Sequence, residues 1–122
     1  MSFLLKTTNS FRYAFSGIFL FFKTERNASI HLLTTFLVIF CGAILQISSN
    51  DWLWLTIAIS GVICAEMINT SIEKLCNLIT MEQNNTVKQI KDIAAAAVLI
   101  MAIAAVIIGL VVFLPYVFKL MG

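Results

Sequence analysis

Five side chains with the chemistry for proton transfer or cation binding share one face of a single predicted helix. They are Glu66, Asn69, Thr70, Glu73 and Asn77. Their spacing of i, i+3, i+4, i+7 and i+11 places all five along one side of an α-helix. A carboxylate in such a row can act as a general base, and its neighbours can bind a cation through oxygen.

Glu66 is the unusual member of this row, because it lies inside an apolar stretch. Counted from Asp51 at a helical rise of about 1.5 Å per residue, it lies roughly 22 Å into a membrane whose hydrocarbon core is about 30 Å thick. An ionisable side chain at that depth is costly and is a functional candidate by default. The alternative is a structural carboxyl group that is protonated or paired within a helix bundle. We predict that Glu66 is the base for an alcohol substrate.

Oxygen ligands for Mg²⁺ occur near the same membrane boundary. The acidic candidates are Glu25, Glu73 and Asp92, and carboxylates are the ligand type that Mg²⁺ prefers. Taken alone, Glu25 and Asp92 are better explained as solvated interfacial charges. The case for a site therefore depends on Glu66 and Glu73.

The elements that must position these residues are three predicted transmembrane helices, at about 29–48, 52–72 and 93–118. Each is long and apolar enough to span a bilayer. Asp51 is placed as the N-cap of the second helix, whose pattern continues to about Ile79. Thr86 and Gln89 form a T-x-x-Q capping box at the start of the third.

The N-terminal segment at about 8–23 has a different pattern. Polar residues gather on one side of a 3.6-residue period and phenylalanines on another. We interpret it as an amphipathic helix lying on the membrane surface. The alternative, a fourth span, is disfavoured because about 12 apolar-patterned residues are too few to cross the core.

Positive residues predict the orientation. Four of them precede the first span, namely Lys6, Arg12, Lys23 and Arg26. Three more lie in or beside the connection between the second and third spans, namely Lys74, Lys88 and Lys91. Only Lys119 follows the third span. Since positive loops stay inside, we expect a multi-pass protein of the inner (plasma) membrane with a cytoplasmic N-terminus.

Composition agrees with one membrane-embedded domain over residues 1–122. The chain is 61% hydrophobic and 11% charged, with a formal net charge of +2. A charge this small gives no basis for nucleic-acid binding. The sequence has no Gly-rich phosphate loop, so any nucleotide must be bound through a carboxylate-held metal and a few basic groups.

Two segments carry a family resemblance. Residues 66–73 read E-M-I-N-T-S-I-E and resemble the E-x-x-N-[ST]-[AS]-I-E signature of the prokaryotic diacylglycerol kinase family. Residues 91–98 read K-D-I-A-A-A-A-V and resemble its K-D-x-x-[AS]-A-A-V segment. Tyr13, Gly17 and Glu25 fit its N-terminal pattern, and the resemblance extends from about Lys6 to Pro115.

This resemblance implies a homotrimer of three-span subunits that transfers the γ-phosphate of ATP to diacylglycerol, giving phosphatidic acid, with Mg²⁺ as cofactor. It implies that Glu66 is the catalytic base and that Glu25 and Glu73 bind the metal. The residues that it assigns to nucleotide binding are Lys6, Tyr13, Glu25, Asn69, Glu73, Lys91 and Asp92.

The chain departs from the family pattern at four positions. Asn77 stands where the family commonly has Asp, and Ala95 replaces a frequent Ser or Gly. Gln83 and Asn84 replace an aromatic residue and a His that often follow the acidic residue matching Glu82.

Other functions stay open at this point. Within the family, the acceptor could be undecaprenol in place of diacylglycerol. Outside it, a small multidrug-type transporter also uses one intramembrane Glu, although such proteins usually have four spans. A non-catalytic membrane subunit is the third alternative. Mg²⁺-dependent ATP consumption separates a kinase from the last two.

Overall fold

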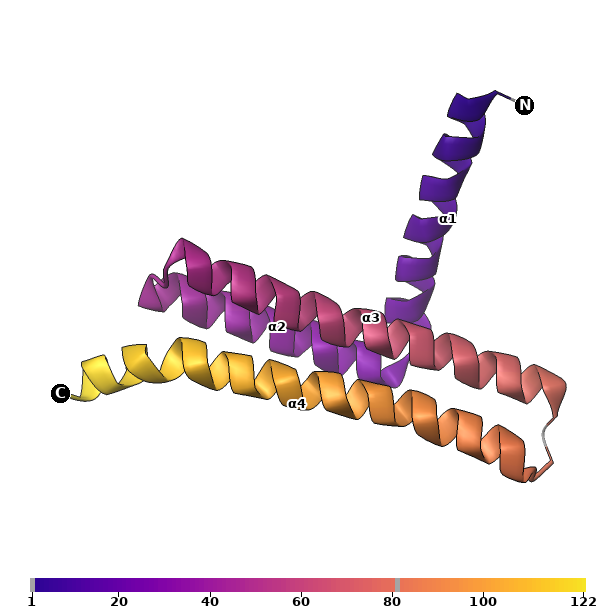
Figure 1. Cartoon of the computed structure of the whole chain (residues 1–122). Coiled ribbons are helices and arrows are strands. Elements are labelled where there is room, and N and C mark those ends of the chain that lie inside the picture. Colours follow the sequence, from indigo (N-terminus) through magenta and orange to yellow (C-terminus); the bar gives the residue numbers. More distant parts are fainter. Residues whose placement is uncertain (1, 81) are drawn as a thin grey trace. The chain divides into compact units, whose positions relative to one another are not determined.

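The computed structural model describes residues 2–80 and 82–122, and these residues form four α-helices joined by short connections (Figure 1). The helices are α1 (Phe3–Thr24), α2 (Arg26–Leu45), α3 (Ser49–Ile79) and α4 (Asn85–Met121). The chain divides into two compact units, residues 1–34 and residues 35–122. The boundary falls inside α2, and each unit is described below by itself. The predicted all-α fold is confirmed.

Three of the helices, α2, α3 and α4, are long and apolar enough to cross a membrane. Each contains most of one predicted span, so the prediction of three helices long and apolar enough to span a membrane is confirmed. α3 has 31 residues, which at the helical rise is about 46 Å and exceeds a hydrocarbon core of about 30 Å. Its C-terminal part, which carries Glu73 and Asn77, therefore has the length to project beyond the core.

α1 is longer than the predicted 8–23. It begins at Phe3 because Ser2 caps it: the Ser2 hydroxyl accepts a hydrogen bond from the N–H of Leu5 at 3.3 Å. It ends before Glu25, whose backbone is extended at ψ 126°. Most α1 side chains are exposed in this chain. That α1 is amphipathic and lies on a membrane surface stays a prediction.

The connection between α2 and α3 is a tight reversal. Gln46 adopts a left-handed conformation at φ 53°, and the N–H of Ile47 donates to the Gly42 carbonyl at 3.2 Å. The prediction that Asp51 is the N-cap of α3 was wrong, because Ser48 takes that place. The Ser48 hydroxyl accepts the Asp51 N–H at 3.1 Å, and the Asp51 carboxylate accepts the Ser48 N–H at 3.4 Å. The two residues form a capping box.

α3 and α4 run antiparallel and lie side by side (Figure 1). Near the start of α3 they share an apolar cluster centred on Ile47, Leu55 and Val112. Around this centre pack Val38, Leu45, Trp52, Ile108, Phe113 and Tyr116. Further along, a Cβ atom at Gly61 would collide with the side chain of Met101. Gly61 thus leaves room on α3 for the end of the flexible Met101 side chain of α4.

The start of α4 also differs from its prediction. The cap is Asn84 and not Thr86: the Asn84 Oδ1 accepts the N–H groups of Thr86 at 2.9 Å and Val87 at 3.1 Å. The helix already begins at Asn85, so Thr86 lies inside it and cannot form the predicted capping box with Gln89. The capping Asn fixes the geometry of the connection that brings α4 back along α3.

Candidate active site

Glu66 lies on the buried stripe of α3. Leu55, Ala58 and Val62 precede it at intervals of three or four residues, and all four side chains are buried. Glu66 is 9% exposed, and among the described residues it is the one charged side chain that is buried. The helical period that packs α3 against its neighbours therefore places a carboxylate on the buried stripe of the helix, where a charged group is costly to keep.

The polar face continues from Glu66 toward the C-terminal end of α3 with rising exposure. Asn69 and Thr70 are half-buried, while Glu73 is exposed. The Asn69 Oδ1 atom is buried and has no hydrogen-bond partner. Because a buried carbonyl oxygen normally has a donor, this atom is a natural ligand for an incoming cation or hydrogen-bond donor. The predicted row on α3 is confirmed as one face that runs from buried to exposed.

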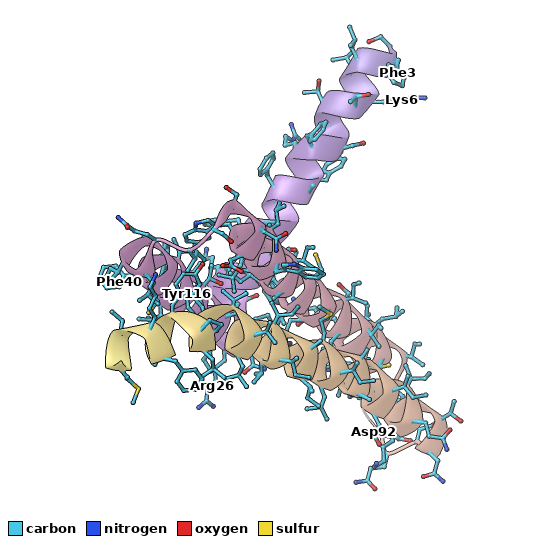
Figure 2. The ribbon with its side chains drawn as sticks, turned by 60° about the vertical axis from the view of Figure 1, so that its left-hand side comes forward. Phe3, Lys6, Arg26, Phe40, Asp92 and Tyr116 are labelled. Carbon is cyan, nitrogen blue, oxygen red and sulfur yellow. The ribbon has the colours of Figure 1, made fainter. Side chains whose placement is uncertain are left out.

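α4 adds basic and acidic groups to the same end of the pair. The Lys91 Nζ donates a hydrogen bond to the Asn77 Oδ1 at 2.7 Å, which links α4 to the last turns of α3. One turn of α4 carries an ion pair between Lys88 Nζ and Asp92 Oδ2 at 2.6 Å. Lys91 and Asp92, both predicted from the sequence, therefore lie at the end of the helix pair that carries Asn77. Figure 2 shows Asp92 and Tyr116 toward opposite ends of α4.

A cavity of about 350 Å³ opens at the connection between α3 and α4. It is lined by Glu82, Gln83, Asn84, Asn85, Val87, Lys88 and Lys91. Sequence reasoning used Lys88 only for topology and missed its place here. The signal was present, because Lys88 stands four residues before Asp92 and one helical turn before Lys91.

The remaining predicted residues belong to the unit of residues 1–34. Lys6 and Tyr13 are exposed and lie seven residues apart, on one face of α1 (Figure 2 labels Lys6). The Arg12 guanidinium lies 5.8 Å from the centre of the Tyr13 ring. Glu25 is half-buried just after α1, and its N–H donates to the Phe21 carbonyl at 3.0 Å. The part of Lys6, Tyr13 and Glu25 in the site stays a prediction.

The donors on α3 fit Mg²⁺ that arrives with a nucleotide. Within residues 2–80 and 82–122, no three His, Cys, Asp or Glu side chains form a group that could hold a metal by themselves. Mg²⁺ does not require such a group, since it commonly binds through one or two carboxylates and the phosphates of its substrate. The exposed Glu73 carboxylate and the unpartnered Asn69 oxygen are donors of the required type.

Comparison with known proteins gives the family of the chain. A family model described as prokaryotic diacylglycerol kinase matches residues 12–113, which include the whole polar row on α3 and the basic start of α4. The chain belongs to the prokaryotic diacylglycerol kinase family. The resemblance found in segments 66–73 and 91–98 is thereby confirmed.

Two curated relatives in this family have different acceptors in their names. The chain is 38% identical to "Undecaprenol kinase" of Bacillus subtilis (strain 168) over 106 residues, which cover 87% of this chain and 86% of the relative. It is 37% identical to "Diacylglycerol kinase" of a Synechocystis species over 113 residues, which cover 92% of this chain but only 65% of the relative.

Members of the prokaryotic diacylglycerol kinase family are membrane lipid kinases, for which ATP and Mg²⁺ are typical. Membership in that family, together with three helices apolar enough to span a bilayer, indicates a kinase of the inner membrane. It favours the kinase interpretation over the transporter and the non-catalytic subunit.

Proposed function

We propose that this protein transfers the γ-phosphate of ATP to the hydroxyl group of a lipid alcohol held in the membrane. One observation carries the proposal. A buried carboxylate, Glu66, is followed on the same helix face by the unpartnered oxygen of Asn69 and then by the exposed carboxylate of Glu73. This order matches a lipid hydroxyl at depth and an aqueous nucleotide one or two turns away.

In the proposed reaction, Glu66 accepts the proton of the lipid hydroxyl. The alcohol oxygen forms its bond to the γ-phosphorus while the bond to the β–γ bridging oxygen breaks, and ADP leaves with that oxygen. Little covalent chemistry is required of the protein, so position and charge supply most of the catalysis. Because α3 is one continuous helix, it fixes the position of Glu66 relative to Asn69 and Glu73.

The nucleotide is bound at the end of the α3·α4 pair that carries Lys91. We assign Asn69, Lys91 and Asp92 to nucleotide binding, together with Lys6 and Tyr13 of the N-terminal unit. Glu73 and Glu25 would hold the Mg²⁺ that accompanies ATP, and each would also contribute to the nucleotide site. The ion would neutralise charge on the phosphates.

Diacylglycerol is the acceptor predicted from the sequence, and undecaprenol is the second candidate. Two observations support testing undecaprenol alongside diacylglycerol. The relative named for it matches this chain over nearly the full length of both. In addition, residues 93–114 of α4 contain no polar side chain that could hydrogen-bond the ester carbonyls of diacylglycerol. The Thr34 hydroxyl on α2 bonds the Ile30 carbonyl of its own helix at 2.9 Å.

The protein acts, we propose, as a homotrimer with its N-terminus in the cytoplasm. The positive residues before the first span and around the α3–α4 connection support this orientation. It places Lys91 and the loop cavity on the side of the membrane that contains ATP. Support for the trimer comes from the family resemblance.

The test is phosphate transfer by the purified full chain in mixed micelles that offer diacylglycerol and undecaprenol side by side. With γ-labelled ATP and Mg²⁺, label should appear in the phosphorylated form of at least one lipid and disappear when Mg²⁺ is chelated. Label in phosphatidic acid alone identifies diacylglycerol, and label in undecaprenyl phosphate alone identifies undecaprenol. No label in either lipid would contradict the proposed function.

A further inference from the structure

The ammonium group of Lys91 is held across the helix pair by an uncharged partner. Its Nζ donates to the Asn77 Oδ1 at 2.7 Å, from the second turn of α4 to the last turns of α3. Lys91 is half-buried, and Asn77 is exposed. A long side chain that would otherwise sample many rotamers is therefore fixed in one place between two rigid helices.

The neighbouring lysine, Lys88, has a charged partner. Lys88 pairs with the Asp92 carboxylate at 2.6 Å, so its positive charge is matched by a negative one. Asn77 accepts one hydrogen bond from Lys91 but carries no charge, and an ammonium group has three donors. The hydrogen bond to Asn77 places no negative charge beside Lys91 and uses one of its three N–H donors.

Both lysines line the cavity at the α3–α4 connection, as does Glu82. Of these two lysines, Lys88 is paired with the negative charge of Asp92, whereas Lys91 is hydrogen-bonded to the neutral amide of Asn77. A phosphate group entering the cavity would gain most from this ammonium group, which is already oriented and not already neutralised.

We infer that Asn77 is a positioning residue: it orients Lys91 toward the nucleotide phosphates through a neutral acceptor that leaves the lysine charge unmatched. This inference rests on the proposed function and deepens it. Because the family pattern commonly has Asp at this position, the neutral acceptor is a feature in which this chain departs from that pattern. An ionised Asp would accept the same hydrogen bond but would compete with phosphate for the charge of Lys91.

The deciding variant is Asn77→Asp, which is nearly isosteric and keeps the acceptor. We expect the KM for MgATP to rise about 2- to 5-fold, the range of a solvent-exposed ion pair, with kcat and the lipid KM unchanged. Raising ionic strength from about 0.05 M to about 0.5 M should reduce the difference in the KM for MgATP between Asn77→Asp and wild type, because salt screens the added charge. If Asn77 only joined the two helices, Asn77→Asp would bind MgATP as well as wild type does.

Two further variants serve as controls. Asn50→Asp makes the same chemical change on an exposed residue in the first turn of α3, roughly 40 Å along the helix from Asn77. It should leave the KM for MgATP unchanged. In a Lys91→Met background, adding Asn77→Asp should cause no further loss of nucleotide affinity, since the charge on which it acts is gone.

MgATP binding is also measured directly, by equilibrium dialysis in detergent without lipid substrate, alongside the thermal unfolding of each variant. Weaker binding by a stably folded Asn77→Asp, dependent on Lys91, supports the inference. Equal binding by wild type and Asn77→Asp overturns the positioning role and leaves the proposed function standing. A wild-type chain that binds no nucleotide overturns both.

Discussion

The two ends of the antiparallel α3·α4 pair use polar side chains in opposite ways. At the Tyr116 end, the Tyr116 hydroxyl donates to the Asp51 carboxylate at 2.6 Å and accepts the N–H of Ser48 at 3.1 Å. Asp51 and Ser48 also cap the helix start through each other. The Tyr116 hydroxyl and the N–H groups of Ser48 and Asp51 all have acceptors within the chain, beside the apolar cluster that includes Val112.

At the Lys91 end, the polar side chains are buried without a hydrogen-bond partner, exposed, or bonded to a neutral group. The buried Asn69 Oδ1 has no hydrogen-bond partner, the Glu73 carboxylate is exposed, and Lys91 is held by a neutral amide. The hydrogen-bonded groups at the Tyr116 end stabilise the helix pair, whereas the buried Asn69 oxygen has no partner within the chain and could accept a bond from a ligand. The comparison teaches that one end of the helix pair is held together by its own polar contacts, while the other end carries the residues that we propose bind the nucleotide.

The largest expected effect is at Glu66. Glu66→Gln is nearly isosteric and cannot accept the substrate proton, so transfer should fall by about 10²- to 10⁴-fold. The assembly and thermal stability of the protein should stay close to wild type. Initial rates of lipid phosphorylation in mixed micelles measure the loss. A variant that keeps half of its activity would remove Glu66 from the role of base.

A smaller effect is expected at the proposed metal ligands. Glu73→Gln should raise the Mg²⁺ concentration needed for half-maximal rate or abolish turnover, because an amide is a weaker Mg²⁺ ligand than a carboxylate. Glu25→Gln should act in the same direction but more weakly. Rates titrated against Mg²⁺ at fixed ATP give the comparison. Unchanged titration curves in both variants would contradict the metal assignment.

The two ends should also differ in the side of the membrane that they face. In a background without Cys41, Cys64 and Cys76, Ser49→Cys should be labelled by an impermeant thiol reagent added outside intact cells, and Asn85→Cys should not. Both positions are exposed in the chain. Permeabilised cells, in which both should react, provide the control. The reverse pattern would put the Lys91 end on the side without ATP.

The sequence predicts helices and faces better than it predicts their ends and contacts. Three spans and the Glu66 to Asn77 row follow from hydropathy and the helical period, which are local properties of the chain. The helix starts were misplaced at Asp51 and Thr86, because Ser48 and Asn84 cap N–H groups nearer the N-terminus and each helix therefore begins earlier than predicted. Several residues at each site offer a cap, and spacing alone does not rank them.

The bond between Asn77 and Lys91 was beyond sequence reasoning for a different reason. It depends on the register of α3 against α4, which is set by the Asn84 cap, the close contact at Gly61 and the apolar cluster at the far end. No short-range pattern encodes that register. By contrast, the ion pair of Lys88 with Asp92 is an i, i+4 spacing and could have been predicted.

The smallest expected effect is at the Tyr116 end, where Tyr116→Phe removes the hydroxyl and keeps the ring. Asp51 and Ser48 lose a partner but still cap α3 through each other, and the ring still packs on the apolar cluster. We expect thermal unfolding in detergent to begin a few degrees lower, with the kcat and the KM for MgATP unchanged. Glu66→Gln should give the opposite pattern, with stability kept and transfer lost. If Tyr116→Phe instead reduced turnover as strongly as Glu66→Gln, the division into a structural end and a binding end would be wrong, and the polar groups at both ends would have to belong to one coupled site.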